Sequence, residues 1–170
     1  MLEQLGAALA ARGIGFVHAA DGAAALRYLM ERIPAGARVM NGGSATLEEI
    51  GFLEMLGKGA YEWLRPAIAA TEEREERTRR RRQATTADWL IGGANAITMS
   101  GEIVNVDGSG NRLAGYAFGA GKVILVAGVN KVVPDLAAAL DRIRNTARSE
   151  ERRVGKECTS WCRSRWSPYH

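Results

Sequence analysis

The sequence predicts a single α/β domain built on a mostly parallel sheet with helices on both faces. Apolar segments of strand length alternate along the chain with segments whose apolar residues recur every three or four positions. The segment KVILVAGVN at 122–130 is apolar at almost every position, which is typical of a strand buried on both faces of a parallel sheet. Glycine-rich turns separate several strands from the helices that follow them. Together these patterns favour a sheet covered by helices.

The first half of the chain supplies helices with one apolar stripe and short strands between them. Gly13 and Pro34 mark two helix ends, because glycine favours a helix C-terminus and proline cannot continue one. After a strand and the turn Asn41-Gly42-Gly43, Ser44 starts the next helix. The expected elements are helices over residues 2–12, 21–33 and 44–56 and strands at 14–20 and around 39–40.

The run TEEREERTRRRRQ at 71–83 is almost entirely charged. Glutamates precede arginines at four-residue spacing, which suits an exposed helix. The contiguous arginines 79–82 also allow a phosphate-binding patch. Consecutive helix residues point in different directions, however, and this favours a solvated helix face.

The second half of the chain carries the remaining strands. Ser100-Gly101 has the composition of a hairpin turn between two short strands. Pro134 is placed in the first turn of the last helix, whose residues Leu136, Leu140 and Ile143 are expected to face inward. The expected elements are a strand ending at Gly92-Gly93, hairpin strands at 96–99 and 102–106, a glycine-rich turn within 108–118 that leads into a helix, a strand at 122–130 and a helix at 135–143.

The composition is that of one soluble globular domain. The chain has 170 residues, of which 46% are hydrophobic and 25% charged. Its longest apolar stretches are far shorter than the roughly 20 residues that span a bilayer, and the N-terminus lacks the apolar block of a signal peptide. A cytoplasmic location without a membrane partner is therefore expected.

Residues 148–170 form a tail without hydrophobic periodicity. Back-translated, RSEERRVGKEC and CRSRWSPYH resemble the two constant halves of a sequencing-library adapter, so we interpret 148–170 as read-through and 1–147 as a domain truncated at its C-terminus. Six of the 23 Lys and Arg residues and three of the 19 Asp and Glu residues lie in this tail. The net charge of 1–147 is therefore +1 rather than +4, which removes the reason to expect a nucleic-acid partner.

Both cysteines, Cys158 and Cys162, lie in the tail. Residues 1–147 therefore cannot use a thiol nucleophile, a Cys-ligated zinc ion or a Cys-ligated iron–sulfur cluster. The pair has metal-like spacing, but further ligands are missing, so no metal site is assigned.

The segment NGGSATLEE lies where parallel sheets bind ligands, between a strand end and a helix start. Gly42 and Gly43 allow close approach to the backbone, Ser44 and Thr46 supply hydroxyls, and the N–H groups of the first helical turn favour an anion. Capping of the helix by Ser44 or Thr46, with Glu48 or Glu49 completing a capping box, is an equally open interpretation. No lysine follows the glycines, so this is not a Walker loop.

A second group of polar residues follows Gly92-Gly93. A tight turn accounts for the presence of Asp107 and Gly108 but not for that of Arg112. The Arg112 side chain could hold a carboxylate or phosphate, or it could pair with a structural acid. Lys131 ends the last strand and is a candidate anion contact. The sole histidine before the tail, His18, has no acid–base partner that spacing can identify. The candidate ligand-binding residues are Gly42, Gly43, Ser44, Thr46, Glu49, Asn95, Asn105, Asp107, Asn111, Arg112 and Lys131.

At NGGSATLEEIG, GANAITMSGEIVNVDGSGNR and KVILVAGVNKVVPDLAAALDRIRN the sequence resembles the LUD domain of lactate-utilisation proteins, of the LutC/YkgG type. The resemblance covers essentially all of residues 1–147. It implies a cytoplasmic protein needed to oxidise L-lactate to pyruvate beside iron–sulfur partner proteins, with no cofactor of its own.

The LUD domain is in turn similar in fold to ribose-5-phosphate isomerase, the CoA transferases and the regulatory subunits of initiation factor 2B. GGSAT resembles the isomerase's phosphate-binding turn, and GANAITMSGEIVNVDGSGN resembles the methylthioribose-phosphate isomerase branch, with Asn95 where those enzymes carry an acid. Asparagine cannot act as a general base, which disfavours isomerase chemistry but leaves binding of a sugar phosphate, nucleotide or carboxylate possible. A CoA transferase needs a placed glutamate, and nothing assigns Glu49 that role.

Two functions follow as hypotheses. In the first, the domain is a subunit without iron–sulfur clusters that binds a small anion at the glycine-rich turn and supports redox chemistry performed by its partners. In the second, the pocket is vestigial and the protein is an assembly or regulatory subunit. Whether the chain is itself an enzyme stays open, and a homo-oligomer is compatible with either hypothesis.

Overall fold

The computed structural model describes residues 1–147, so the tail at 148–170 and its two cysteines lie outside the described residues. The first half contains α1 (Leu2–Ala10), α2 (Gly22–Arg32), β1 (Arg38–Asn41), α3 (Ala45–Glu49), α4 (Phe52–Gly57), β2 (Glu62–Trp63), α5 (Leu64–Ala69), α6 (Arg74–Ala84) and β3 (Trp89–Gly92). The second half contains β4 (Ala96–Thr98), β5 (Ile103–Val104), α7 (Asn111–Ala114), a π-helical turn (Gly115–Gly119), β6 (Lys122–Leu125), a 3-10 turn (Val129–Lys131), β7 (Val132–Val133), α8 (Leu136–Arg142) and a second π-helical turn (Ile143–Ala147).

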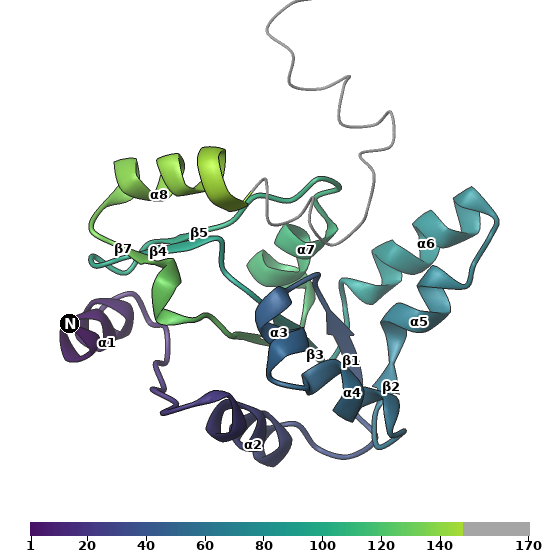
Figure 1. The fold of residues 1–170 in the computed structure, drawn as a ribbon. Helices are drawn as coiled ribbons and strands as arrows, with labels where there is room; N and C mark the ends of the chain where they lie inside the picture. The colour runs from purple at the N-terminus through teal and green to yellow at the C-terminus, as the bar shows by residue number, and fades with distance from the viewer. Residues whose placement is uncertain (148–170) are drawn as a thin grey trace, which may run out of the picture.

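Four strands form the main sheet in the order β2-β1-β3-β6, and all of its neighbouring pairs are parallel. A second sheet has the order β5-β4-β7, in which β4 is antiparallel to β5 and parallel to β7. Helix α8 packs on this second sheet (Figure 1). The prediction of an α/β fold with a mostly parallel sheet is confirmed.

The main core joins the sheet to α2, α3 and α4. Trp89 and Ile91 of β3 point into this core, together with Leu47 of α3 and Phe52 of α4. Leu90, between them in the strand, points to the opposite face, because side chains alternate along a strand. There it packs so closely on the π-helical turn that a Cβ at Gly115 would lie 2.4 Å from Leu90 Cδ2. Both faces of the sheet are therefore covered.

The helix expected over 44–56 is broken into α3 and α4. Gly51 adopts a left-handed conformation with φ of 78°, which ends the first helix and redirects the chain. This change of direction lets Leu47 and Phe52, both fully buried, enter the same core from two short helices. Apolar spacing alone did not show the break, because it continues through Gly51.

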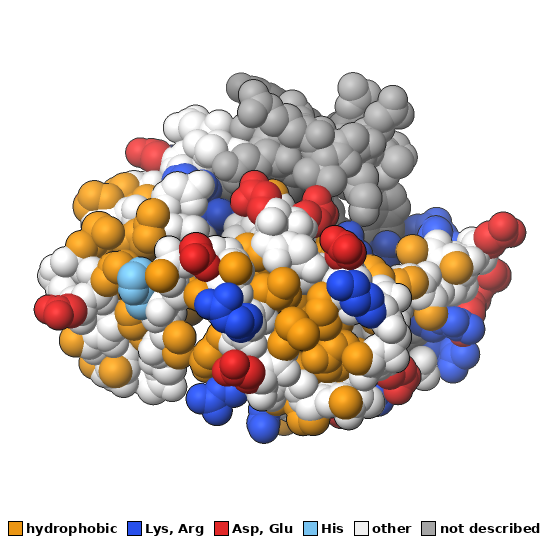
Figure 2. Space-filling model, turned by 60° about the horizontal axis from the view of Figure 1, so that its bottom comes forward, with side chains coloured by type: hydrophobic (Ala, Val, Ile, Leu, Met, Phe, Trp, Pro, Cys, Tyr) orange, Lys and Arg blue, Asp and Glu red, His pale blue; other side chains and the backbone are white. Residues whose placement is uncertain are grey.

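The strand expected at 14–20 is absent, and residues 14–19 form no helix or strand. Phe16 and Val17 are exposed in this segment, and so is His18, the one histidine in the described part of the chain (pale blue in Figure 2). The apolar composition of the segment resembles a strand, but no strand pairs with it among the described residues. Sequence composition cannot reveal whether a pairing strand is available.

The end of the domain differs from the prediction in two ways. The strand expected at 122–130 ends at Leu125 and is the edge of the main sheet, so Val123 is exposed rather than buried. Helix α8 begins after Asp135, whose side chain accepts a hydrogen bond from Ala138 N, and Pro134 therefore precedes the helix. The short strand β7 before it was not expected from the sequence.

The inward face of α8 also differs from the prediction. Ala139 is buried, whereas Leu136 and Leu140, which were expected to face inward, are 50% and 42% exposed. Helix α8 contacts β4 and β7. The buried alanine lets the helix approach this small sheet closely, so its packing face is not the leucine stripe.

The predicted hairpin is present and is fixed by a cluster around Glu102. The hydroxyls of Ser100 and Thr98 donate to the Glu102 carboxylate, and Arg12 Nη2 donates to it over 2.6 Å. Arg12 Nε also donates to Ser100 O over 2.9 Å, which ties the end of α1 to the hairpin turn. The two hydroxyl hydrogen bonds, aided by Arg12, lower the pKa of Glu102 from 4.5 to about 2.

This pKa predicts an acid-sensitive hairpin. A carboxyl whose pKa is lower in the folded than in the unfolded protein adds stability above pH 4.5 and loses it as the pH falls towards 2. Urea unfolding from pH 6 to pH 2.5 should therefore show a smaller fall in stability for Glu102→Gln than for the unmodified protein. Parallel pH profiles for the two proteins would contradict this role of Glu102. Glu54→Gln, which changes an exposed acid on α4, is the matched control.

Candidate functional site

The carboxyl ends of three parallel strands meet at one edge of the main sheet. Gly42 N, just after β1, donates to Ile91 O over 3.0 Å, and Val126 N, just after β6, donates to Gly92 O over 2.8 Å. The turns that follow β1, β3 and β6 are therefore neighbours. This edge is where open parallel sheets bind their ligands, and it contains the glycine turn predicted from the sequence, residues Gly42–Ser44.

Ser44 caps α3, which is the capping role that the sequence allows beside anion binding. Its Oγ accepts a hydrogen bond from Leu47 N at 3.4 Å. Thr46 lies in the first turn of α3, while Glu49 is exposed at its far end, about 7.5 Å along the axis from Ser44 at 1.5 Å per residue. Glu49 is therefore not brought to the glycine turn. Helix α3 has only five residues, so its dipole adds little to the attraction for an anion.

Asn41, which the sequence did not single out, holds the start of the glycine turn through hydrogen bonds of its buried side chain. Asn41 is only 1% exposed at the end of β1, where its Oδ1 accepts a hydrogen bond from Trp63 Nε1 at 2.7 Å. Its Nδ2 donates to Gly42 O over 3.1 Å. Arg65 Nη1 donates to the same carbonyl over 3.4 Å. These hydrogen bonds fix the direction of the backbone as it enters the turn.

Arg112 lies over the glycine turn, 69 residues away from Gly43 in sequence. Its Nη1 donates to Gly43 O over 3.5 Å and its Nη2 to Val106 O over 2.5 Å. A Cβ at Gly42 would lie 2.9 Å from Arg112 Cδ, so only glycine accommodates the side chain in this position. Asp107 holds the arginine's backbone, since its Oδ2 accepts from Arg112 N at 2.8 Å. The structure thus brings Arg112 and Asp107 to the predicted turn.

The predicted asparagines have structural partners. Asn105 Oδ1 accepts from Asn95 N at 3.1 Å, and Asn95 Oδ1 accepts from Val106 N at 2.9 Å. These two hydrogen bonds tie the segment after β3 to the segment after β5. Asn111 Oδ1 accepts from the hydroxyl of Ser109 at the start of α7. The asparagine side chains thus shape the loop that carries Asp107 and the start of α7, the helix that carries Arg112.

Lys131 lies at the end of the 3-10 turn before β7, where its N–H donates to Gly128 O over 3.0 Å. The neighbouring Asn130 is linked to Asn95 through Arg142, which donates to Asn95 O over 2.8 Å and to Asn130 O over 3.4 Å. These bonds anchor the loop of Lys131 to the segment after β3. A direct role of Lys131 in ligand binding stays a prediction.

Tyr116 is a second residue at this edge of the sheet that the sequence did not single out. Its Oη is buried and has no hydrogen-bond partner among residues 1–147. A Cβ at Gly92 would lie 1.6 Å from this oxygen, and one at Gly42 would lie 3.7 Å from it. Burial raises the pKa of Tyr116 to about 12. The positive charge of Arg112 lowers this pKa, and the negative charge of Asp107 raises it by a smaller amount. The phenol is therefore protonated at neutral pH.

The π-helical turn Gly115–Gly119 places this tyrosine. Ala120 N donates to Gly115 O over 3.1 Å, five residues back, which widens the turn. A Cβ at Gly119 would lie 2.4 Å from Thr85 O, so the turn packs directly against backbone on the same side of the sheet as Leu90. In the sequence, this turn is marked only by the two glycines that flank Tyr116-Ala117-Phe118. Their spacing alone does not show which atoms those glycines contact.

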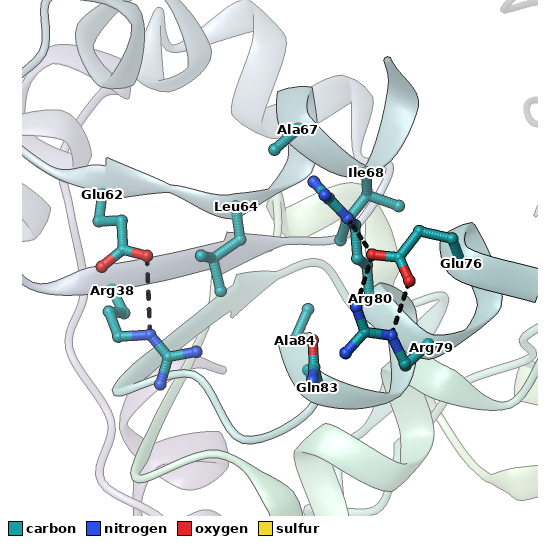
Figure 3. Close-up of a pocket in the computed structure, with 10 residues that line it drawn as sticks. All are labelled: Arg38, Glu62, Leu64, Ala67, Ile68, Glu76, Arg79, Arg80, Gln83 and Ala84. Carbon is teal, nitrogen blue, oxygen red and sulfur yellow. Dashed lines mark hydrogen bonds and ion pairs between the residues drawn. The ribbon is translucent and has the colours of Figure 1, made fainter. Parts of the chain in front are cut away.

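The larger of the two cavities described lies at the opposite edge of the sheet. Its volume is about 300 Å³, and it is open to solvent and lined by α5, α6 and the starts of β1 and β2 (Figure 3). Arg38 and Glu62 face each other there at 3.9 Å, and Glu76 pairs with Arg79 and Arg80 at 2.6 and 2.8 Å. Hydrogen bonds from these two arginines lower the pKa of Glu76 to about 2. The pairing favours a solvated helix over a phosphate-binding patch.

Residues 1–147 hold no group of three or more His, Cys, Asp or Glu side chains that is placed to bind a metal ion. None of the helices in this part of the chain is long and apolar enough to cross a bilayer. Compared with known families, the chain matches the LUD domain over residues 2–167. A search of curated proteins found no match.

Proposed function

The chain belongs to the LUD domain family, and on that basis we propose that it serves in lactate utilisation as a subunit that binds a small anion at the glycine turn Gly42–Ser44. Residues 1–147 contain no cysteine. Iron–sulfur clusters that take up electrons from L-lactate would be carried by partner proteins of the cytoplasm, as in the LutC/YkgG type. The subunit would present or retain the carboxylate while its partners carry out the oxidation.

The observation that carries this proposal is the position of the Arg112 guanidinium over the glycine turn. Its two terminal nitrogens donate to the carbonyls of Gly43 and Val106. A carboxylate or phosphate is a stronger acceptor than a carbonyl and can bind a guanidinium through two parallel hydrogen bonds. An anion at the turn would therefore compete with these two carbonyls for the guanidinium, while Asp107 keeps the arginine's backbone in place.

Thermal unfolding with and without ligand tests the proposal, with Gly43→Ala as the variant. A Cβ at Gly43 meets nothing within 4 Å, so the fold accommodates it, but the methyl group occupies the space in which a ligand approaches the backbone. The native protein should gain about 2.7 kcal/mol at a hundredfold excess of L-lactate, pyruvate or inorganic phosphate over the dissociation constant. Gly43→Ala should lose this gain and keep the unliganded melting temperature.

Gly57→Ala is the matched control. Gly57 is also open to a Cβ, but it ends α4, from which the chain returns to the amino-terminal edge of the sheet. Its response to ligand should equal that of the native protein. An equal response of Gly43→Ala would remove the glycine turn from the site. No response of the native protein to any of the anions would favour the alternative, an assembly or regulatory subunit with a vestigial pocket.

A further inference from the structure

We propose that the hydroxyl of Tyr116 selects the ligand of the glycine turn, and that this ligand is a carboxylate with an acceptor oxygen on the neighbouring carbon. This selection rests on the proposed function, to which it adds one hydrogen-bond donor that determines specificity. Arg112 would hold the carboxylate, and Tyr116 would donate to the second oxygen.

The first support is the buried phenolic oxygen itself. Tyr116 Oη has no hydrogen-bond partner within residues 1–147, although it is shielded from solvent. A buried hydroxyl without a partner destabilises a folded protein, and phenylalanine would fill the same space without that cost. Buried polar groups of this kind call for a specific explanation, such as a ligand. The hydroxyl is therefore better explained by binding than by folding.

The second support is where this oxygen lies. The backbone of Gly92 at the end of β3 contacts it so closely that any side chain there would collide with it, and Gly42 at the end of β1 lies beside it. Two glycines at neighbouring strand ends thus make room for one phenol. The oxygen is directed to the same edge of the sheet as the glycine turn. Burial raises its pKa to about 12, so it keeps its proton and can donate a hydrogen bond even well above neutral pH.

Arg112 explains how a ligand reaches a shielded oxygen. Arg112 Nε is shielded from solvent together with Tyr116 Oη, and Arg112 Cδ packs over Gly42. The guanidinium is the end of a long side chain and donates here to backbone carbonyls. A carboxylate that draws the guanidinium towards itself would uncover the phenol. The ligand would then meet two donors, a charged one for its carboxylate and a neutral one for its second oxygen.

The expected selectivity is for a 2-hydroxy or 2-oxo acid over the plain carboxylate of the same length. L-Lactate and propionate differ only in the hydroxyl at the second carbon, and they form the matched ligand pair. A site with a hydrogen-bond donor for such an oxygen discriminates against the analogue that lacks it, because only the hydroxy acid gains this hydrogen bond on binding. The native protein should bind L-lactate at least tenfold more tightly than propionate in calorimetric titrations.

Tyr116→Phe is the variant that tests the donor. It should bind L-lactate at least fivefold more weakly than the native protein, bind propionate unchanged and melt at no lower temperature without ligand. Tyr61→Phe, which changes a partly buried tyrosine packed against the core, should leave both affinities unchanged. A lower melting temperature of Tyr116→Phe with unchanged ligand preference would assign the hydroxyl a purely structural role and overturn the proposal.

The ligand pair separates failure of this proposal from failure of the proposed function. Equal affinities of the native protein for L-lactate and propionate, both lost in Gly43→Ala, would overturn the role of Tyr116 and leave the anion site in place. No binding of either acid by the native protein would overturn both. The comparison of ligands needs only the native protein, so it remains decisive even where a variant folds poorly.

Discussion

Replacing Gly92 with alanine is expected to destabilise the domain by about 3 kcal/mol, near the upper end of what overpacking costs. The new Cβ would lie 1.6 Å from Tyr116 Oη and 2.7 Å from Cζ of the same ring. Gly92 ends a strand buried at all four positions, so the backbone has little room to retreat. The ring must leave its place instead. Urea unfolding of Gly92→Ala measures the cost, and the response to L-lactate should be lost with it.

A double-mutant cycle identifies Tyr116 as the cause. Tyr116→Ala removes the ring that Gly92→Ala displaces, so the double variant should be more stable than the sum of the two single effects predicts, by at least 1 kcal/mol. Gly108→Ala is the control, because a Cβ at this glycine meets nothing within 4 Å and should cost little. Additive effects of Gly92→Ala and Tyr116→Ala would show that the glycine is needed for a reason other than the tyrosine.

Phe52→Ala is expected to have the largest effect on stability, a loss of about 3–5 kcal/mol. Phe52 is fully buried and is the largest such side chain in the described part of the protein. It begins α4 directly after the left-handed Gly51 and packs in the core with Leu47, the residue that anchors α3 below the glycine turn. Its removal leaves a cavity under the element that carries the turn. Chemical denaturation measures the loss.

Phe118→Ala is the matched control, since Phe118 is 95% exposed. Its replacement should change the unfolding free energy by less than about 0.5 kcal/mol, as is usual for surface positions. Comparable losses for the two phenylalanines would contradict the core described here. Phe52→Ala should also bind ligand more weakly, even in the fraction of molecules that stays folded, because α3 loses its support in the core and the glycine turn before it is displaced.

The sequence predicted those parts of the fold that local patterns specify. The cores of β1, β3 and β6 are continuous apolar segments, and the cap residues Asp21 and Ser44 mark the starts of α2 and α3. The segment at 14–20 was misjudged because a strand needs a partner, which local composition does not reveal. The break at Gly51 was missed because the apolar spacing continues through it.

The candidate site was predicted in part. The glycine turn, Asp107 and Arg112 were identified from residue types at a strand end and a tight turn, and the structure brings them together. Tyr116 was missed because its role depends on contacts with Gly42 and Gly92, which lie 74 and 24 residues away in the chain. Such contacts arise only when the strand ends are aligned. Glu49 is close to the turn in sequence, but it ends α3 and the helix carries it away from the turn.

The central claim is that an anion binds at the glycine turn, and nuclear magnetic resonance of ¹⁵N-labelled protein tests it most directly. During titration with L-lactate, the backbone amides of Gly43, Ser44 and Ala45 should shift and saturate together with that of Arg112. The same titration of Gly43→Ala should leave Arg112 unshifted. Saturating shifts confined to residues around the α5–α6 cavity, such as Ile68 and Ala84, would contradict the claim and move the site to the opposite edge of the sheet.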